Sequence, residues 1–315
     1  MQSSFGRRIK LPLPPRLVNQ NVCRVGAGVC FAIMREVHTV QFGMREVWGG
    51  EIPFGLSVND RRQHVYVIGK SCTGKTALLR NSIIQDIASW HGVGVIDPHG
   101  DLAAELLNHI PSSRTDDVVY FDATAAEHPI GLNLLQNVPP DERHRVASEL
   151  VSSLKAIWRE SWGPRMEYIL YAAIAAILDT TDGSLLGVQR ILSDESYRRW
   201  VVRQVKDPAV FRFWSVEFAG YADRFRREAV APIENKVGQL LMAPPMRNVL
   251  GQVRRKVDAR FMMNDRRIFI ANLAKGTLGE DKANLLGSML VSSFQLAAMS
   301  RADIPEEDRR RVLFT

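Results

Sequence analysis

The residues with the clearest chemical meaning form a short glycine-rich loop at residues 69–76, with the sequence GKSCTGKT. Gly69, Gly74, Lys75 and Thr76 satisfy the pattern G-x-x-x-x-G-K-[ST], in which the main chain bends around phosphate groups. Successive N–H groups point inward, the lysine ammonium reaches the outer phosphates, and the hydroxyl binds Mg²⁺. The spacing therefore predicts a nucleoside triphosphate site, with ATP and Mg²⁺ as cofactors.

Every position of this loop has a predicted role. The cofactor-binding residues are Gly69, Lys70, Ser71, Cys72, Thr73, Gly74, Lys75 and Thr76. Lys75 and Thr76 are also predicted to be catalytic, because Lys75 stabilises charge on the β- and γ-phosphates and Thr76 is the metal residue for Mg²⁺. Cys72 stands where many such loops have glycine. Either the loop tolerates it, at a cost on the order of 1 kcal/mol if φ is positive, or its oxidation blocks the nucleotide.

The segments around the loop match the structural context that it requires. Residues 64–69 (HVYVIG) predict a buried strand, and apolar residues recur at helical spacing from Lys75 to Trp90. A second strand is predicted at residues 92–97, a helix from Asp101 to Pro111, and a third strand at residues 118–121. Alternating strands and helices indicate an α/β core with right-handed crossovers and a mainly parallel sheet.

Hydrolysis of ATP needs carboxylates that hold Mg²⁺ and orient water, and these usually end buried strands. Asp97 ends the strand at residues 92–97, and Asp122 follows the strand at residues 118–121. We expect Asp97 to lie near the nucleotide as a third catalytic residue. Asp122 and His99 are expected to be strand-end or turn residues. Neither strand carries the adjacent Asp-Glu pair of motor ATPases.

The pattern changes near residue 138 and returns near residue 258. Between these positions only helical spacing occurs, which predicts an all-α domain inserted into the α/β core. A strand at residues 267–271, a helix at 283–299 and the start of a strand at 311–314 follow. The predicted parts are listed by residue range: an irregular arm 1–48, the first part of the core 49–137, the all-α domain 138–257, and the return to the core 258–315, incomplete at its C-terminus.

Composition limits the classes of function. The 315 residues are 46% hydrophobic and 24% charged, which is typical of a globular protein with a sizeable core. The formal net charge of +7 favours a partner that carries phosphate, such as DNA or an anionic membrane surface. The cysteines Cys23, Cys30 and Cys72 form neither a disulfide framework nor a zinc-binding pair. We expect no membrane-spanning segment and a cytoplasmic location.

Taken together, these motifs resemble the conjugative coupling ATPases of type IV secretion (TraD-like) and the HerA/FtsK superfamily of P-loop DNA translocases. The resemblance covers residues 50–315. It rests on HVYVIGKSCTGKTALLRNSIIQDI, GVGVIDPHGDL, DDVVYFD, HPIGLNLL and FIANLAKGTLGEDKANLLGSML in this order, and on WGPRMEYIL at residues 162–170.

The resemblance implies a RecA-like P-loop NTPase core with an inserted all-α domain, and a homo-oligomer, a hexamer, that moves DNA through its channel. It also implies type IV secretion components as partners at the inner face of the cell membrane. In that family an Asp-Glu pair follows a strand like RRRVLF, so the pair would lie just past Thr315. We therefore expect this chain to lack those carboxylates and the arginine finger after them. Residues 1–48 do not resemble the family.

Three functions stay open: a DNA translocase that hydrolyses ATP, a module that binds ATP and DNA without hydrolysis, and a soluble HerA-like motor in DNA repair. Basic clusters at residues 224–227, 254–256 and 309–311 either contact DNA phosphates or form solvated faces. The tryptophans of the helical region are expected in its core rather than as surfaces for base stacking. These are Trp158, Trp162, Trp200 and Trp214.

Overall fold

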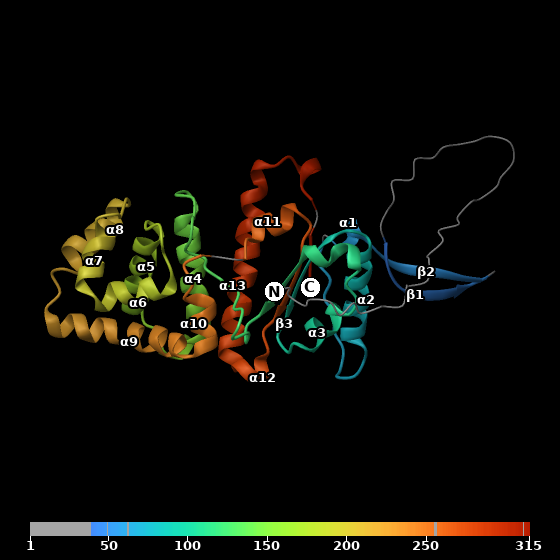
Figure 1. Cartoon of the computed structure of the whole chain (residues 1–315), viewed down its shortest axis with the longest axis horizontal. Coiled ribbons are helices and arrows are strands. Elements are labelled where there is room, and N and C mark those ends of the chain that lie inside the picture. The colour runs from blue at the N-terminus through green and yellow to red at the C-terminus, as the bar shows by residue number, and fades with distance from the viewer. Residues whose placement is uncertain (1–38, 49, 62, 255–256, 311) are drawn as a thin grey trace, which may run out of the picture. The chain divides into compact units, whose positions relative to one another are not determined.

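A four-stranded parallel sheet lies at the centre of the α/β part of the chain (Figure 1). The computed structural model describes residues 39–315, except residues 49, 62, 255–256 and 311. The strand order is β4-β5-β3-β6, and the described pairings in this sheet are all parallel, as predicted. The strands are β3 (Gly92–Asp97), β4 (Val118–Asp122), β5 (Ile268–Asn272) and β6 (Val312–Phe314).

Helices cover both faces of this sheet, which is why its strands are apolar on both sides. Helices α2 (Lys75–Ala88) and α3 (Asp101–Leu107) pack on one face, and α11 (Ala259–Asn264) and α13 (Glu280–Ser300) pack on the other. The side chains of β5 alternate accordingly between the two apolar clusters. Shorter elements of this part are α1 (Val58–Arg61), η1 (Ser112–Asp117), α12 (Lys275–Leu278), η4 (Arg301–Asp303) and η5 (Glu306–Asp308).

The described residues between 138 and 257 contain helices and turns, as predicted. The helices are α4 (Arg143–Ile157), η2 (Arg159–Ser161), α5 (Pro164–Leu178), α6 (Leu185–Ser193), α7 (Glu195–Val202), α8 (Pro208–Arg212), the π-helix η3 (Phe213–Glu217), α9 (Asp223–Met242) and α10 (Pro244–Leu250). The larger apolar cluster joins these helices to α11 and α13, so the boundaries at 138 and 257 stay predictions. No helix among the described residues is long and apolar enough to cross a membrane.

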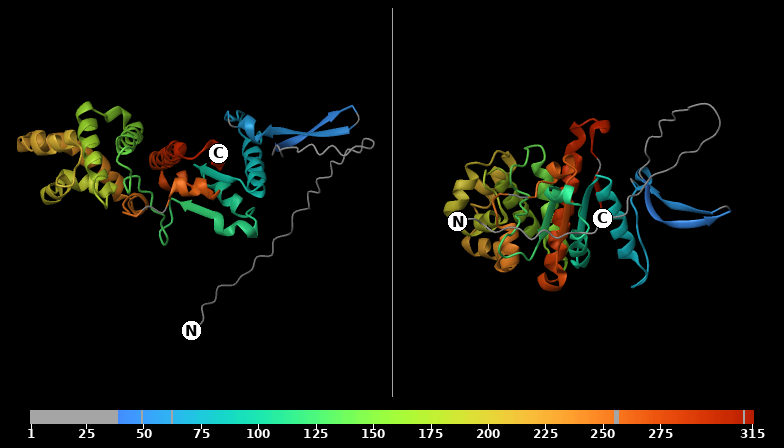
Figure 2. Two further views of the ribbon diagram at one scale, coloured as in Figure 1. Left: turned by 90° about the horizontal axis from the view of Figure 1, so that it is seen from above. Right: turned by 45° about the vertical axis from the view of Figure 1, so that its right-hand side comes forward.

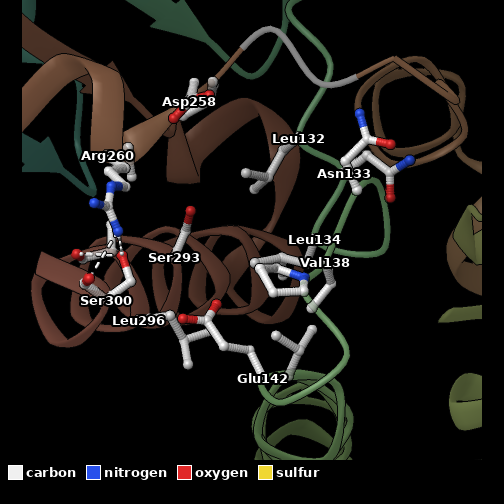
Figure 3. A pocket seen from close by; sticks show the side chains of 16 residues that line it. Leu132, Asn133, Leu134, Val138, Glu142, Asp258, Arg260, Ser293, Leu296 and Ser300 are labelled. Atoms are coloured by element: carbon white, nitrogen blue, oxygen red, sulfur yellow. Dashed lines mark hydrogen bonds between the residues drawn. The ribbon is translucent and has the colours of Figure 1, made fainter. Parts of the chain in front are cut away.

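Two chain segments connect the helical region with the sheet, and hydrogen bonds hold them together. The Leu132 N–H donates to the Val249 carbonyl. The buried Asn133 side chain donates to the Gly183 and Val253 carbonyls at 2.7 and 2.6 Å. A cavity of about 180 Å³ lies beside these segments, between the start of α4 and the end of α13, with Glu142 and Ser293 among its lining (Figure 3).

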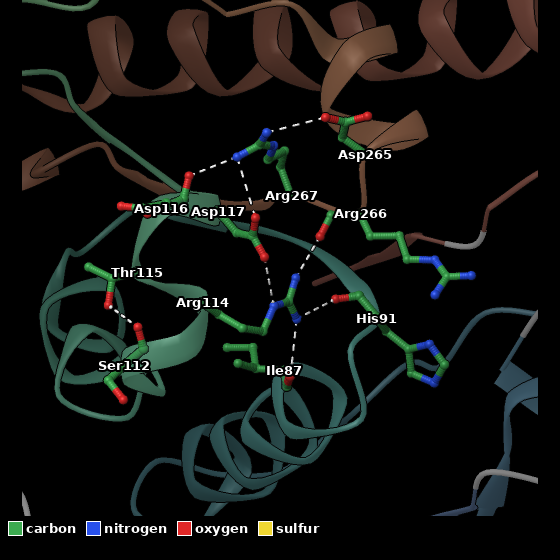
Figure 4. Close-up of polar contacts among 10 residues, drawn as sticks. All are labelled: Ile87, His91, Ser112, Arg114, Thr115, Asp116, Asp117, Asp265, Arg266 and Arg267. Atoms are coloured by element: carbon green, nitrogen blue, oxygen red, sulfur yellow. Dashed lines mark hydrogen bonds and ion pairs between the residues drawn. The ribbon is translucent and has the colours of Figure 1, made fainter.

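Arg114 joins four segments at the other end of the sheet, where the strands begin (Figure 4). Only 1% of its surface is exposed. Its guanidinium donates to the carbonyls of Ile87, His91 and Arg266 at 3.0, 2.9 and 2.6 Å. It also pairs with Asp117 at 3.1 Å and lies 5.3 Å from the centre of the Trp90 ring. Arg114 therefore connects α2, η1 and the residues that directly precede β3 and β5.

An antiparallel hairpin precedes the core, formed by β1 (Thr39–Val47) and β2 (Gly50–Ser57). The prediction of an irregular arm is wrong for residues 39–47, and residues 1–38 of that arm lie outside the described residues. The pairing register of β1 shifts between Gln41 and Gly43, and this shift interrupts the alternation of side chains by which a strand is recognised in a sequence. The Gln85 side chain of α2 makes two hydrogen bonds of 2.9 Å with the Gln41 main chain, and Figure 2 shows the hairpin beside α2.

The predicted strand at residues 64–69 is wrong for this structure, because these residues form neither a strand nor a helix and lie outside the sheet. Val65, Tyr66 and Ile68 are 48%, 88% and 79% exposed. A groove of about 760 Å³ lies between residues 64–67 and β6, which is only three residues long. A strand needs a partner for its main-chain hydrogen bonds. The apolar pattern signals the tendency to form a strand, but it does not supply that partner.

Candidate nucleotide-binding site

The glycine-rich loop precedes α2, and the topology of the sheet places it at the carboxyl ends of the strands. Helix α2 packs on β3 and reaches it through the short connection at residues 89–91, so the two elements run in opposite directions. The N-terminus of α2 therefore lies at the end of the sheet where β3 terminates. In open α/β sheets, ligands bind at this edge.

Three hydrogen bonds within the loop bring the Lys75 side chain and the main chain of residues 69–70 together. The Lys75 ammonium donates to the carbonyls of Gly69 and Lys70 at 2.8 and 2.7 Å. The Thr73 hydroxyl also donates to the Lys70 carbonyl, at 2.8 Å. These bonds fold the loop back over the start of α2 and hold the Lys75 charge within the turn. A phosphate oxygen that entered the turn would accept from the same ammonium.

The start of α2 is suited to an anion. Gly74 is the N-cap, with φ of 87°, a left-handed conformation that glycine adopts at little cost. No side chain caps this end of α2 by a hydrogen bond, and its first turn contains no acidic residue. The first N–H groups of a helix carry a partial positive charge, so this 14-residue helix can bind phosphate there.

Cys72 departs from the common form of this loop, and its backbone shows why glycine is usual at that position. Its φ is 63°, in the left-handed region. A side chain there costs on the order of 1 kcal/mol. The thiol is free and exposed. The loop tolerates the residue in this conformation, while the oxidation of Cys72 stays a prediction.

The position of Thr76 at the start of α2 suits a ligand of Mg²⁺. Thr76 is exposed in the first turn of α2, directly after Lys75. Mg²⁺ commonly uses few protein oxygens together with phosphate oxygens and water, and an exposed hydroxyl beside a phosphate-binding turn fits that role. The described residues contain no group of three or more His, Cys, Asp or Glu side chains arranged to hold a metal.

Asp97 ends β3 at the predicted edge, but its carboxylate is already hydrogen-bonded to the main chain. It is 7% exposed. One oxygen accepts from the His99 N–H and the other from the Ala103 N–H, both at 3.0 Å. Asp97 therefore fixes the turn at residues 98–100 and the first turn of α3. Its catalytic role stays a prediction, and His99 lies in this turn as expected.

Two further polar residues end the neighbouring strands. Asp122 accepts hydrogen bonds from the Thr124 N–H and hydroxyl at 2.8 and 2.7 Å, which matches the expected turn residue. Asn272, in register with both Asp97 and Asp122, was missed. Its side chain accepts from the Ala274 N–H at 2.9 Å and donates to the Tyr120 hydroxyl at 3.1 Å. A polar residue at the end of the apolar run RIFIAN was the available signal.

Replacing Gly100 with alanine is expected to destabilise this edge of the sheet. Gly100 has φ of +95°, and a Cβ there would lie 2.3 Å from the Asn272 Oδ1 atom. Strain and displacement of Asn272 together should cost about 2–3 kcal/mol of unfolding free energy. Urea denaturation measures this cost. Gly163→Ala is the control, because Gly163 lacks both a positive φ and a close neighbour. Equal stability of the two variants would contradict the prediction.

Several arginines of the basic clusters have partners within the chain. Arg224 and Arg226 form ion pairs with Glu228 and Asp223 at 3.1 and 3.3 Å. Arg309 donates to the Ile304 carbonyl at 2.7 Å. Arg255, Lys256 and Arg311 of the other clusters lie outside the described residues. The partners found in the clusters at residues 224–227 and 309–311 support the interpretation that these clusters are solvated faces. Contact with DNA stays a prediction.

Comparison with known proteins supports the fold. No family model and no curated protein matches the sequence. A solved structure described as the bacterial conjugative coupling protein TrwBdeltaN70, in an unbound monoclinic form, matches with a TM-score of 0.53 at 15% identity. The match covers 83% of this chain and 56% of that chain. The predicted fold class, a RecA-like P-loop core of α/β type, is confirmed at this level.

Proposed function

We propose, from the fold shared with the coupling protein TrwB, that this chain binds ATP with Mg²⁺ at residues 69–76 and serves as the motor core of a DNA translocase. The observation that carries the proposal is the Lys75 ammonium, held within a turn at the uncapped N-terminus of α2. Neither the loop sequence nor the fold alone is as specific as this combination.

Different residues of the loop would bind different parts of MgATP. Main-chain N–H groups between Gly69 and Thr76 would surround the phosphates, and Lys75 would exchange its carbonyl acceptors for β- and γ-phosphate oxygens. Thr76 would hold Mg²⁺, which supplies charge neutralisation on the phosphates when bound. Asp97 would support this edge of the sheet through its two main-chain hydrogen bonds.

DNA and a second copy of the chain are the partners that we propose. The net charge of +7 favours a polyanion. A ring of subunits, a hexamer, would supply the channel through which DNA moves, and type IV secretion components would recruit it. The proposed place of action is the cytoplasm or the inner face of the cell membrane. The repair motor of the HerA kind would use the same site with other partners.

One observation favours a second candidate, a module that binds ATP and DNA without hydrolysis. The carboxylates of Asp97 and Asp122 both accept hydrogen bonds from their own turns. Both carboxylates therefore already hold turns of the main chain, which is a structural role rather than the positioning of a water molecule. Binding of ATP requires neither carboxylate, so binding without turnover is the result that this candidate predicts.

ATP turnover by this chain, measured with and without DNA, tests the proposal. Turnover that single- or double-stranded DNA stimulates would support the translocase. ATP and DNA binding without turnover would support the second candidate. If MgATP does not bind at all, both candidates fail, because both depend on the loop at residues 69–76. A filter-binding or calorimetric titration with MgATP measures that first step.

A further inference from the structure

An open groove of about 610 Å³ lies between the end of α4 and the start of α5, far along the chain from the nucleotide loop. This volume lies within the range of about 300–1,000 Å³ common to ligand sites. We call it the α4–α5 groove. Its lining includes the aromatic side chains Trp162, Tyr168 and Tyr171 and the basic side chains Lys155 and Arg159.

Hydrogen bonds fix two of the three aromatic side chains of this groove, those of Trp162 and Tyr168. The Trp162 indole N–H donates to the Glu167 carboxylate at 2.6 Å. The Tyr168 hydroxyl donates to Glu217 at 3.0 Å, and its ring meets Phe213 edge to face at 5.1 Å. Tyr168 nevertheless remains 49% exposed. Aromatic rings held this way lose little entropy when a flat ligand stacks on them.

A further cation, Lys236, holds the loop that carries Trp162. Lys236 donates to the Ser161 hydroxyl, and its ammonium lies 5.5 Å from the centre of the Trp158 ring. Trp158 packs against the larger apolar cluster, as the sequence suggested. Trp162 also packs against that cluster, and it lines the groove as well. Of these two neighbouring tryptophans, Trp162 is therefore the one placed to contact a ligand in the groove.

The charges of the groove favour a phosphate. Glu167 accepts from Lys155 at 2.8 Å and from Trp162, and these hydrogen bonds, that from Lys155 first, hold the pKa of Glu167 below its ordinary value. The carboxylate is thus ionised and already paired. Arg159 is exposed, and the described residues give its guanidinium no hydrogen bond or ion pair. It is therefore available to an incoming anion.

We propose that the α4–α5 groove binds single-stranded DNA, with bases stacked on Trp162 and Tyr168 and a backbone phosphate paired with Arg159. Stacking surfaces beside a free cation are the features by which proteins bind unpaired nucleotides without reading sequence. In duplex DNA the bases are already stacked on each other, so their faces are not available. A basic protein segment would need a free carboxylate, and Glu167 is already paired. The proposal rests on the proposed function, since it assumes DNA as the partner.

The affinity of the full chain for a labelled homothymidylate of about 12 nucleotides tests this site. Trp162→Ala should weaken binding by roughly five- to a hundredfold, because stacking contributes that much per base. Trp162→Phe should retain most of the affinity, since it keeps a ring. Arg159→Ala should reduce the slope of log affinity against log salt by about 0.7, the value for one phosphate on a single strand.

Matched controls lie on the same helical region outside the groove. Arg199→Ala removes the same charge from a side chain that is 66% exposed, and Trp200→Ala removes the same ring from a residue that is 44% exposed. Both should bind the oligonucleotide like the wild type. If Trp162→Ala does not fold, the salt slope of Arg159→Ala still decides, because Arg159 is exposed and its guanidinium has no hydrogen bond or ion pair among the described residues.

The outcomes separate this proposal from the proposed function. Wild-type affinity and salt slope in the groove variants would overturn the groove as a DNA site, and a protein ligand would then be the alternative occupant. The proposed function would survive that result, because the wild type would still bind DNA. If the wild type binds neither the single-stranded oligonucleotide nor a duplex, the proposed function fails and the groove proposal fails with it.

Discussion

Replacing Lys75 with alanine is expected to abolish the stabilisation of this chain by MgATP while leaving the fold intact. A ligand present at about a hundredfold excess over its Kd stabilises the folded state by about 2.7 kcal/mol. Lys75 supplies the one side-chain cation that the loop holds within its turn, through bonds to the Gly69 and Lys70 carbonyls. Both residues are exposed, so water can satisfy those carbonyls in the variant.

The measurement is the thermal midpoint of unfolding, with and without MgATP, for the wild type and the variant. Lys206→Ala is the matched control, because Lys206 is an exposed lysine of the helical region, outside the loop. Its midpoint should rise with MgATP as in the wild type. If Lys75→Ala shows the full rise, the nucleotide lies elsewhere. A wild type with no rise would mean that the loop does not bind ATP.

Replacing Arg114 with alanine is expected to lower the free energy of unfolding by about 3–5 kcal/mol, the largest effect on stability that we predict. Removal of the guanidinium takes the side-chain donor from the carbonyls of Ile87, His91 and Arg266, of which the Ile87 carbonyl keeps the Trp90 N–H. It also removes one of the two arginine partners of Asp117, leaving Arg267, and the contact with Trp90. Arg114→Lys should lose most of the same stability, because one ammonium cannot match the planar donors of arginine.

Urea denaturation with the midpoint and slope measured separately checks this prediction. Arg224→Ala serves as the control, since its ion pair with Glu228 is exposed to solvent and should contribute no measurable stability. Arg114 lies at the ends where the strands begin, away from the nucleotide loop, so ATP binding by the folded fraction should be unchanged. A midpoint equal to that of the wild type would show that the buried network is not stabilising.

The motif at residues 69–76 and the alternation of strands and helices were predictable, because both depend on neighbours in the sequence. Glycine, lysine and threonine at fixed spacing before a helical pattern indicate a phosphate-binding turn. The strand at residues 268–272 was recognisable because apolar residues on both faces indicate a sheet covered by helices. These local patterns gave the fold class, and the comparison with TrwB confirms it.

The contacts that decide the remaining features join residues far apart in the chain. Arg114 lies in SSRTDD, a segment with the composition of a surface turn, and only the fold brings the Arg266 carbonyl to it. Residues 64–69 have the composition of a strand, yet a strand forms only where another main chain lies alongside. Trp158 and Trp162 are four residues apart and both pack against the same apolar cluster, but only the fold shows that Trp162 also lines a groove with Arg159. Composition and spacing thus predicted the phosphate-binding loop, and the packing of distant segments decided where charge, strain and aromatic surface are placed in the fold.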